Sequence, residues 1–187
     1  MSAKPLLNTV DEDGNIIGED TRENIHKNGL LHREVHVWFY TPQGEIIFQH
    51  RGKNADTFPD LLDATIGGHV EIGEDFESTA LQEIREETGL EITKNQLVFL
   101  RLVRDNNYDE VTKTTNNVLR TIYTVCFKGN INDLQLEKGK GVGFEAWSFD
   151  KIFEISQENK SNFIPAILKE PTTSIFKQIQ TLYEQSR

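Results

Sequence analysis

Residues Gly67 to Leu90 read GGHVEIGEDFESTALQEIREETGL, and this stretch decides the fold. We predict a helix from Glu74 to Thr88 that ends at Gly89, because glycine readily adopts the left-handed conformation at a helix C-cap. At about 100° per residue, three carboxylates fall on one face of that helix: Glu83, Glu86 and Glu87. Grouped carboxylates suit hard divalent cations such as Mg²⁺, although an ordinary solvated acidic face shows the same pattern.

The glycines of this stretch favour the metal-binding interpretation. Gly67 and Gly68 end the extended apolar run from Leu61 to Ile66, and Gly73 directly precedes Glu74. Glycine lets the backbone turn sharply and come close to a ligand or a metal. A loop, a helix with three acids on one face and a second loop therefore predict a compact metal platform.

The same stretch resembles the Nudix hydrolases, whose motif is G-x5-E-x7-R-E-U-x-E-E-x-G-U, with U a bulky aliphatic residue. The positions in register are Gly68, Glu74, Glu83, Ile84, Glu86, Glu87, Gly89 and Leu90. The departure is Gln82, which stands where the family has arginine. The resemblance implies an α+β fold, a Nudix-type α/β/α sandwich with a mixed β-sheet and a loop–helix–loop catalytic motif.

The resemblance also implies a chemistry, in which water attacks a phosphorus of a nucleoside diphosphate linked to another group. Mg²⁺ or Mn²⁺ would bridge the diphosphate and lower the pKa of the attacking water. By motif position, the catalytic and metal-binding residues would be Glu83, Glu86 and Glu87, and the backbone carbonyl of Gly68 would add a metal ligand. Glu74 would orient the loop, and Gln82 would steady its neighbouring glutamate less well than arginine does, because its amide carries no charge. We therefore predict slower turnover, which Gln82→Arg should raise.

A wider resemblance, from Leu31 to Glu74, is to the Nudix branch that contains type 1 isopentenyl-diphosphate isomerase. In those isomerases, histidines matching His32 and His69 help bind a metal, and a cysteine and a later glutamate transfer protons. Here Gly67 stands in place of the cysteine, and the strand from Val118 to Phe127 contains no acid. A hydrolase on an isomerase-like scaffold is favoured. The alternatives are an isomerase-like enzyme and a non-catalytic Nudix module that binds a nucleotide.

Residues outside the helix are candidates for holding the substrate. The candidate substrate residues are Arg51, His69, Glu74 and Arg104, with Lys53, Arg101 and Arg120 as further cations that are each more often solvated at a surface. We expect His32 and His36 to share one face of a strand as structural histidines. We expect the three aromatic residues Trp38, Phe39 and Phe58 to lie in the core.

The remaining pattern predicts one domain with an N-terminal appendage. A hairpin from Leu7 to Gly18 and a short helix from Asp20 to Lys27 form a unit of residues 1–29, packed on a single Nudix domain of residues 30–187. Further strands are predicted at 34–40, 45–51, 96–103, 118–128 and 143–149, and helices from about 150 and at 172–185. The polar segments 104–117 and 130–143 are predicted to be loops that line the pocket.

Composition limits the function classes. The chain has 187 residues with 30 acidic and 20 basic side chains, so its net charge of −10 argues against binding nucleic acid or an anionic membrane surface. The lone cysteine, Cys126, excludes an internal disulfide and a zinc site built on cysteines. No apolar stretch reaches the length of a membrane span, and we expect a cytoplasmic protein that acts on a small-molecule diphosphate, with a homodimer as a possible assembly. Because the acids crowd around one helix, a cation should have to accompany an anionic substrate.

Overall fold

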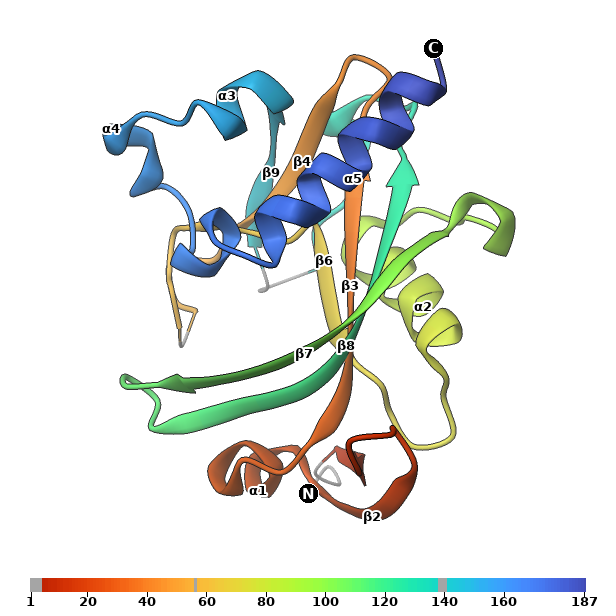
Figure 1. The fold of residues 1–187 in the computed structure, drawn as a ribbon, viewed down its shortest axis with the longest axis vertical. Coiled ribbons are helices and arrows are strands. Elements are labelled where there is room, and N and C mark those ends of the chain that lie inside the picture. The colour runs from red at the N-terminus through yellow and green to blue at the C-terminus, as the bar shows by residue number, and fades with distance from the viewer. Residues whose placement is uncertain (1–4, 56, 138–140) are drawn as a thin grey trace.

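The computed structural model describes residues 5–55, 57–137 and 141–187, and in that part of the chain nine strands form one mixed sheet (Figure 1). Its centre is β3 (His32–Tyr40), which runs parallel to β8 (Thr114–Cys126) along its whole length. Strand β7 (Val98–Asp109) continues the sheet antiparallel to β8.

On the other side of β3 lie two antiparallel strands, β6 (Ile66–His69) beside its first half and β4 (Glu45–Arg51) beside its end. Strand β4 in turn pairs with β5 (Leu62–Asp63) and β9 (Gly141–Ser148). A strand at the centre of a sheet that is covered on both faces needs apolar side chains on each face. The sequence of β3 meets this need, which explains its central position.

The N-terminal segment joins the start of β3. Strands β1 (Leu6–Val10) and β2 (Ile16–Thr21) form a hairpin, and helix α1 (Arg22–Asn28) follows with Thr21 as its N-cap and Gly29, at φ 62°, as its C-cap. The amide of Val10 donates to the carbonyl of Leu31 at 2.9 Å, so β1 extends the sheet. This places α1 beside the first residues of β3 and β8 (Figure 1).

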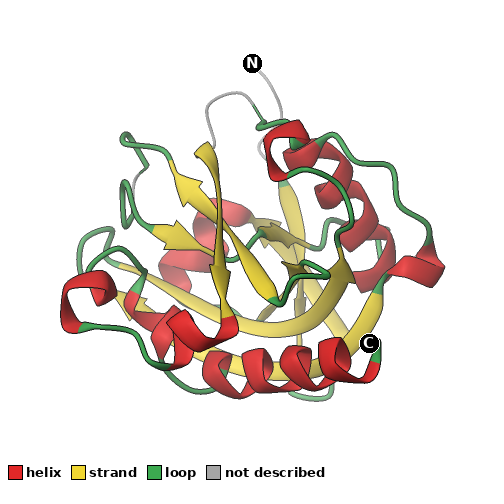
Figure 2. Cartoon of the chain, turned by 90° about the horizontal axis from the view of Figure 1, so that it is seen from above, coloured by secondary structure: helices red, strands yellow, loops and turns green. Residues whose placement is uncertain are grey.

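Helices cover both faces of the sheet (Figure 2). Helix α2 (Phe76–Thr88) covers one face over a core that includes Val35, Val37 and Ile66. Helix α5 (Thr172–Gln185) and the short α3 (Phe149–Phe153) cover the other face, over a core that includes Trp38 and Phe48. The remaining helical pieces are α4 (Gln157–Lys160) and three 3₁₀ turns at Lys94–Gln96, Ile131–Asp133 and Pro165–Leu168. Among the described residues, no helix is long and apolar enough to cross a lipid bilayer.

Most predicted elements are confirmed, including the mixed sheet, the helix before Gly89 and the terminal helix. The predicted loop at 104–117 is wrong, because β7 and β8 continue as a paired ribbon to Asp109 and Thr114, with the turn only between them. The polar residues misled the prediction, since this two-stranded end of the sheet lies outside both apolar cores and needs no apolar alternation. Of the segment 130–143, residues 138–140 lie outside the described residues, and β9 already begins at Gly141. Phe58 is 42% exposed rather than buried in the core, unlike Trp38 and Phe39.

Candidate functional site

Helix α2 is held in place by its ends and by its apolar face. Asp75 caps the start: its carboxylate accepts from the Ser78 amide at 2.7 Å, and its own backbone amide donates to the Ser78 hydroxyl at 3.1 Å. Gly89, at φ 69°, ends the helix in the left-handed conformation. Ala80 and Ile84 are fully buried against the sheet, so the acidic face of the helix has a fixed orientation.

Two of the three predicted carboxylates come close to the sheet. The carboxylate of Glu83 lies against the backbone of Gly68, so closely that a Cβ at Gly68 would overlap it. Glu87 is only 3% exposed, and its Oε2 accepts from the Gln49 side chain of β4 at 3.4 Å. The carboxylates of Glu83 and Glu87 on α2 therefore face the sheet, where Glu83 meets the backbone of Gly68 on β6 and Glu87 meets Gln49 on β4.

Glu86 points into solvent beside that place. Its Oε1 accepts from Gln82 Nε2 at 3.0 Å, one helical turn earlier. Gln82 thus does donate to a glutamate of the motif, as an uncharged amide can. The prediction concerned the adjacent Glu83, whereas the contact found here is to Glu86; a neutral donor forms a weaker bond to a carboxylate than an arginine does.

The donor set fits a hard divalent cation. Glu83, Glu86 and Glu87 supply oxygen atoms only. Because Gly68 has no side chain, the Glu83 carboxylate can lie beside its backbone. Mg²⁺ and Mn²⁺ take carboxylate, carbonyl and water oxygens as ligands.

The predicted substrate residues are spread over different surroundings. Arg51 is tied down by its neighbours: Nη1 pairs with Asp63 at 2.9 Å, and Nε and Nη2 donate to Thr57. Arg104 makes a bidentate pair with Glu12 of the β1–β2 turn, at 2.8 and 3.0 Å. Glu74 precedes α2, and its backbone carbonyl accepts from Arg33 at 3.3 Å. The guanidinium groups of Arg51 and Arg104 are thus each paired with a carboxylate outside helix α2.

His69 points away from the acidic helix. Successive side chains of a strand alternate between the two faces, so Gly68 turns towards Glu83 while His69 turns to the opposite face. There His69 Nε2 lies 3.0 Å from His26 Nε2, and the ring of His32 is stacked 5.2 Å away. Burial lowers the pKa of His69 to about 3, and it lowers the pKa of His26 and of His32 in the same direction. The three imidazoles are neutral at pH 7.

A buried ion pair lies beside the histidines. Arg120 donates through Nε and Nη2 to Glu34 Oε2, both at 2.7 Å, and through Nη1 to Asp105 at 3.0 Å. The other carboxylate oxygen of Glu34 is 3.7 Å from His69 Nε2. Burial alone would raise the pKa of Glu34, but Arg120 and then His69 more than offset it and hold the pKa below its ordinary value. Arg120 is thus a buried partner of two carboxylates, and the expectation of a solvated surface cation is wrong.

Three residues of these sites escaped the sequence analysis: His26, Glu34 and Gln49. Glu34 had a detectable signal, because it stands between His32 and His36 at the strand period of two. His26 stands 43 residues before His69, and nothing local in the sequence joins them. Its place depends on how α1 packs on β8.

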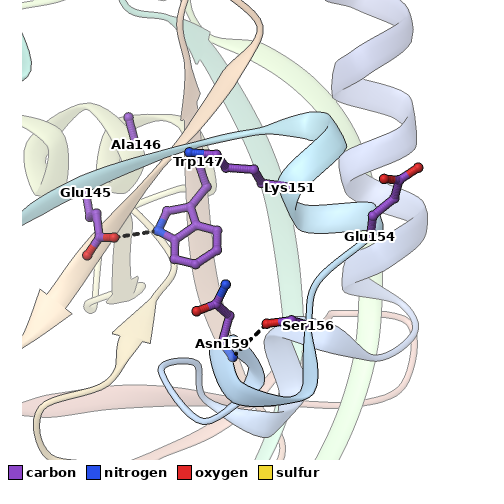
Figure 3. A pocket seen from close by; sticks show the side chains of 7 residues that line it. All are labelled: Glu145, Ala146, Trp147, Lys151, Glu154, Ser156 and Asn159. Carbon is purple, nitrogen blue, oxygen red and sulfur yellow. Dashed lines mark hydrogen bonds between the residues drawn. The ribbon is translucent and has the colours of Figure 1, made fainter.

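Two surface hollows lie outside the histidine cluster. One, of about 320 Å³, runs along the outer side of α2 and includes Glu74, Gln82 and Arg85. The other, of about 290 Å³, lies between β9 and the α3–α4 segment, where Trp147 Nε1 donates to Glu145 at 2.7 Å (Figure 3). The second hollow is lined largely by exposed polar side chains and contains none of the predicted site residues.

Comparison with known proteins places this geometry in a family. The model of the NUDIX domain matches residues 30–167. An uncharacterised Nudix hydrolase of Clostridium acetobutylicum is 27% identical over 150 residues, which is 79% of this chain and 71% of that protein. Another, of Streptomyces coelicolor, is 36% identical over 88 residues, 47% of this chain and 49% of that protein. The chain thus matches about half the length of several of these relatives.

Solved structures share the fold. The DR0079 protein of Deinococcus radiodurans superposes with a TM-score of 0.64 at 19% identity, covering 92% of this chain and 98% of that one. The NUDIX domain of NrtR from Shewanella oneidensis, solved with ADP-ribose, superposes with a TM-score of 0.55 at 16% identity, covering 81% and 86%. At these identities the likeness establishes the architecture.

Proposed function

The chain belongs to the Nudix hydrolase family, and from that premise we propose that it is a divalent-metal-dependent hydrolase of a diphosphate linkage. Its substrate would be a nucleoside diphosphate derivative or a related small molecule. One observation carries the proposal: Glu83 lies against the Gly68 backbone while Glu87, one turn on, is buried on the same helix. An ordinary solvated acidic face needs neither contact.

In the proposed mechanism, Glu83, Glu87 and the Gly68 carbonyl would hold Mg²⁺ or Mn²⁺, with Glu86 beside them. When bound, such an ion polarises the phosphoryl oxygens and lowers the pKa of the attacking water. Glu83 or a neighbouring acid would accept the proton of that water as general base. Gln49 orients Glu87 through its amide, and Gln82 orients Glu86.

The four predicted substrate residues differ in how freely each could contact a bound phosphate. Arg51 and Glu74 are the side chains we retain for the substrate, and a phosphate would have to compete with Asp63 and Thr57 for the Arg51 guanidinium. Arg104 would first have to leave Glu12. His69 faces the histidine cluster, so we assign it to that cluster rather than to the diphosphate.

Release of phosphate or a nucleotide from a panel of diphosphates tests the proposal. The panel contains ADP-ribose, NADH, dinucleoside polyphosphates, oxidised nucleotides and isopentenyl diphosphate, each with and without Mg²⁺. We expect metal-dependent hydrolysis of at least one member, and loss of it in Glu87→Gln but not in Glu158→Gln, an exposed glutamate on α4. Tight binding of one member with no turnover of any would support a non-catalytic module instead. Isomerisation of isopentenyl diphosphate would support the isomerase-like alternative.

We also propose the domain division expected from the sequence, with residues 1–29 as an appendage of a single domain at 30–187. The single registered pair of β1 with β3, Thr9 opposite His32, supports it. The cytoplasmic location and the possible homodimer remain predictions, which cell fractionation and sedimentation of the purified chain would test.

A further inference from the structure

A short turn connects strand β6 to helix α2 (Figure 1). In this turn the amide of Glu74 donates to the carbonyl of Glu71 at 3.2 Å. Gly73, at φ 88°, makes the bend possible, because residues with a side chain rarely adopt this conformation. The turn therefore decides how the acidic face of α2 lies relative to Gly68 on β6.

Arg33 of β3 contacts the chain on both sides of this turn. Before the turn, the Arg33 carbonyl accepts from the amide of Val70 at 3.0 Å. After it, Arg33 Nη2 donates to the carbonyl of Glu74 at 3.3 Å. The guanidinium carbon lies 5.6 Å from the centre of the ring of Phe76, which is the first residue of α2. The central strand is thus joined to the residues on either side of the helix cap, Asp75.

Charge does not explain why an arginine lies here. The amides at the start of a helix carry a partial positive charge, which disfavours a nearby cation. Burial lowers the pKa of Arg33, although the carboxylate of Asp75 opposes this effect. Arg33 Nε is buried, and among the described residues it has no hydrogen-bond partner, which is costly. The placement instead gains two contacts that a planar guanidinium makes together, a hydrogen bond from its edge and a ring contact from its face.

We propose that Arg33 is a positioning residue of the reaction, which holds the first turn of α2 and so keeps the Glu83 carboxylate beside the Gly68 backbone. This inference rests on the proposed function, because it concerns the same site. The apolar contacts of Ala80 and Ile84 press α2 onto the sheet without a preferred direction, whereas the hydrogen bond of Arg33 is directional. Arg33 acts through the helix, and a misplacement of about 1 Å at a reacting group can lower a rate about 100-fold.

Kinetics of variants of the full chain test this role. We expect Arg33→Met to lower kcat about 10- to 100-fold while the KM of the hydrolysed diphosphate changes less than about threefold. Titration with Mn²⁺, followed by electron paramagnetic resonance, should show binding weakened about tenfold. Arg33→Lys keeps the charge but loses the planar group, so we expect it to recover little of the lost kcat. Full recovery of kcat by lysine would overturn the assignment.

A matched control and a second residue make the test specific. Arg187 lies 5.7 Å from the ring of Tyr183, so Arg187→Met removes a similar contact from the C-terminal end of the chain. We expect it to change kcat and Mn²⁺ binding less than about twofold. The loss of kcat in Arg33→Met combined with Phe76→Leu should be smaller than the product of the two single losses, because the two side chains act together. A loss equal to that product would overturn the link from Arg33 to the helix.

Amide exchange separates this inference from the proposed function. The first amide bonded within α2 is that of Thr79, which donates to the Asp75 carbonyl at 3.0 Å. In Arg33→Met, exchange of amides 79–82 should be at least about tenfold faster than in the unchanged protein, without any substrate or metal. If the unchanged protein hydrolysed no diphosphate, the proposed function would fail, whereas faster exchange would still support the hold of Arg33 on the helix.

The opposite combination would overturn this inference alone. It consists of hydrolysis by the unchanged protein together with unaltered kcat, Mn²⁺ binding and exchange in Arg33→Met. Circular dichroism identifies a variant that fails to fold. If Arg33→Met is such a variant, Arg33→Lys, which keeps the charge and most of the side-chain length, supplies the same comparison of kcat and exchange.

Discussion

The two faces of strand β6, which has four residues, are lined by different kinds of side chain: carboxylates on one face and imidazoles on the other. On one side, Gly68 receives the carboxylate of Glu83 from α2, and the donors are charged oxygen atoms. On the other side, His69 meets His26 and His32, and the donors are neutral nitrogen atoms beside a neutralised carboxylate. The first surface suits a hard cation that accompanies a substrate, whereas the second is a neutral histidine cluster beside the ion pair of Glu34 and Arg120.

The comparison shows why the overall charge of −10 is a poor guide to either site. Of the acids of α2, Glu86 is exposed and Glu83 is half-buried, so water screens part of their repulsion, while the buried Glu87 accepts from Gln49. Glu34 is buried, so its charge must be balanced by Arg120 and its other neighbours. Each side thus holds one buried carboxylate, Glu87 or Glu34, and the two differ in their partners, an uncharged amide for Glu87 and a guanidinium for Glu34.

Removing one carboxylate of the acidic side should give the largest effect. Glu87→Gln keeps the shape of the side chain but loses the charge of a metal ligand, and we expect hydrolysis to fall about 10³-fold, since such an ion contributes several kcal/mol to the barrier. Initial rates at saturating Mg²⁺ measure it. A variant that retained more than a tenth of the rate would remove Glu87 from the metal site.

Breaking the buried pair on the histidine side should give the next effect. Arg120→Met leaves Glu34 as an unpaired buried charge, and we expect a loss of about 3 kcal/mol in the free energy of unfolding, measured with urea. Arg104→Met breaks the exposed pair with Glu12 and should cost far less, because water screens both charges. Equal losses in the two variants would mean that burial of Glu34 is energetically unimportant.

The two adjacent glycines offer a direct comparison of the two sides. Gly68→Ala puts a methyl group where the Glu83 carboxylate lies, and we expect hydrolysis to fall about 10- to 100-fold through misplacement of that carboxylate. In Gly67→Ala the methyl group meets the His36 ring instead, at 3.2 Å, and hydrolysis should change less than about threefold. A larger loss in Gly67→Ala would place the reaction on the histidine side.

The histidine side should also make stability depend on pH. Burial, with Arg120 nearby, lowers the pKa of His36 from 6.5 to about 4, so the unfolded chain takes up this proton first as the pH falls. The stability present above pH 6.5 is therefore lost progressively from about pH 6.5 down to about pH 4. In His36→Gln we expect this loss to be smaller by about 2 kcal/mol, as urea unfolding at several pH values would measure. An unchanged slope would assign it to other groups.

The smallest effect concerns the departure from the family motif. Gln82→Arg should strengthen the contact to Glu86 by adding a charge, and we expect hydrolysis to rise about two- to fivefold. The test compares kcat and the Mg²⁺ requirement of the two proteins. A fall in rate would show that the glutamine contact is already optimal for this helix.

The acidic side could be predicted from sequence because its geometry is local. Helical spacing places Glu83, Glu86 and Glu87 together, and Gly68 lies a short loop away. The histidine side depends on contacts between distant segments, such as His26 on α1 with His69, and spacing along the chain says nothing about them. Arg120 was misjudged for the same reason, since its partners Glu34 and Asp105 stand on other strands.

In strand β6, Gly68 and His69 face opposite sides of the sheet only because they are neighbours in the strand. Side chains alternate with a period of two, so a single residue inserted before Gly68 would exchange the sides, turning the glycine towards His36 and the imidazole towards Glu83. Insertion of two residues would restore each to its own side. We therefore expect this strand to tolerate changes in length only in pairs.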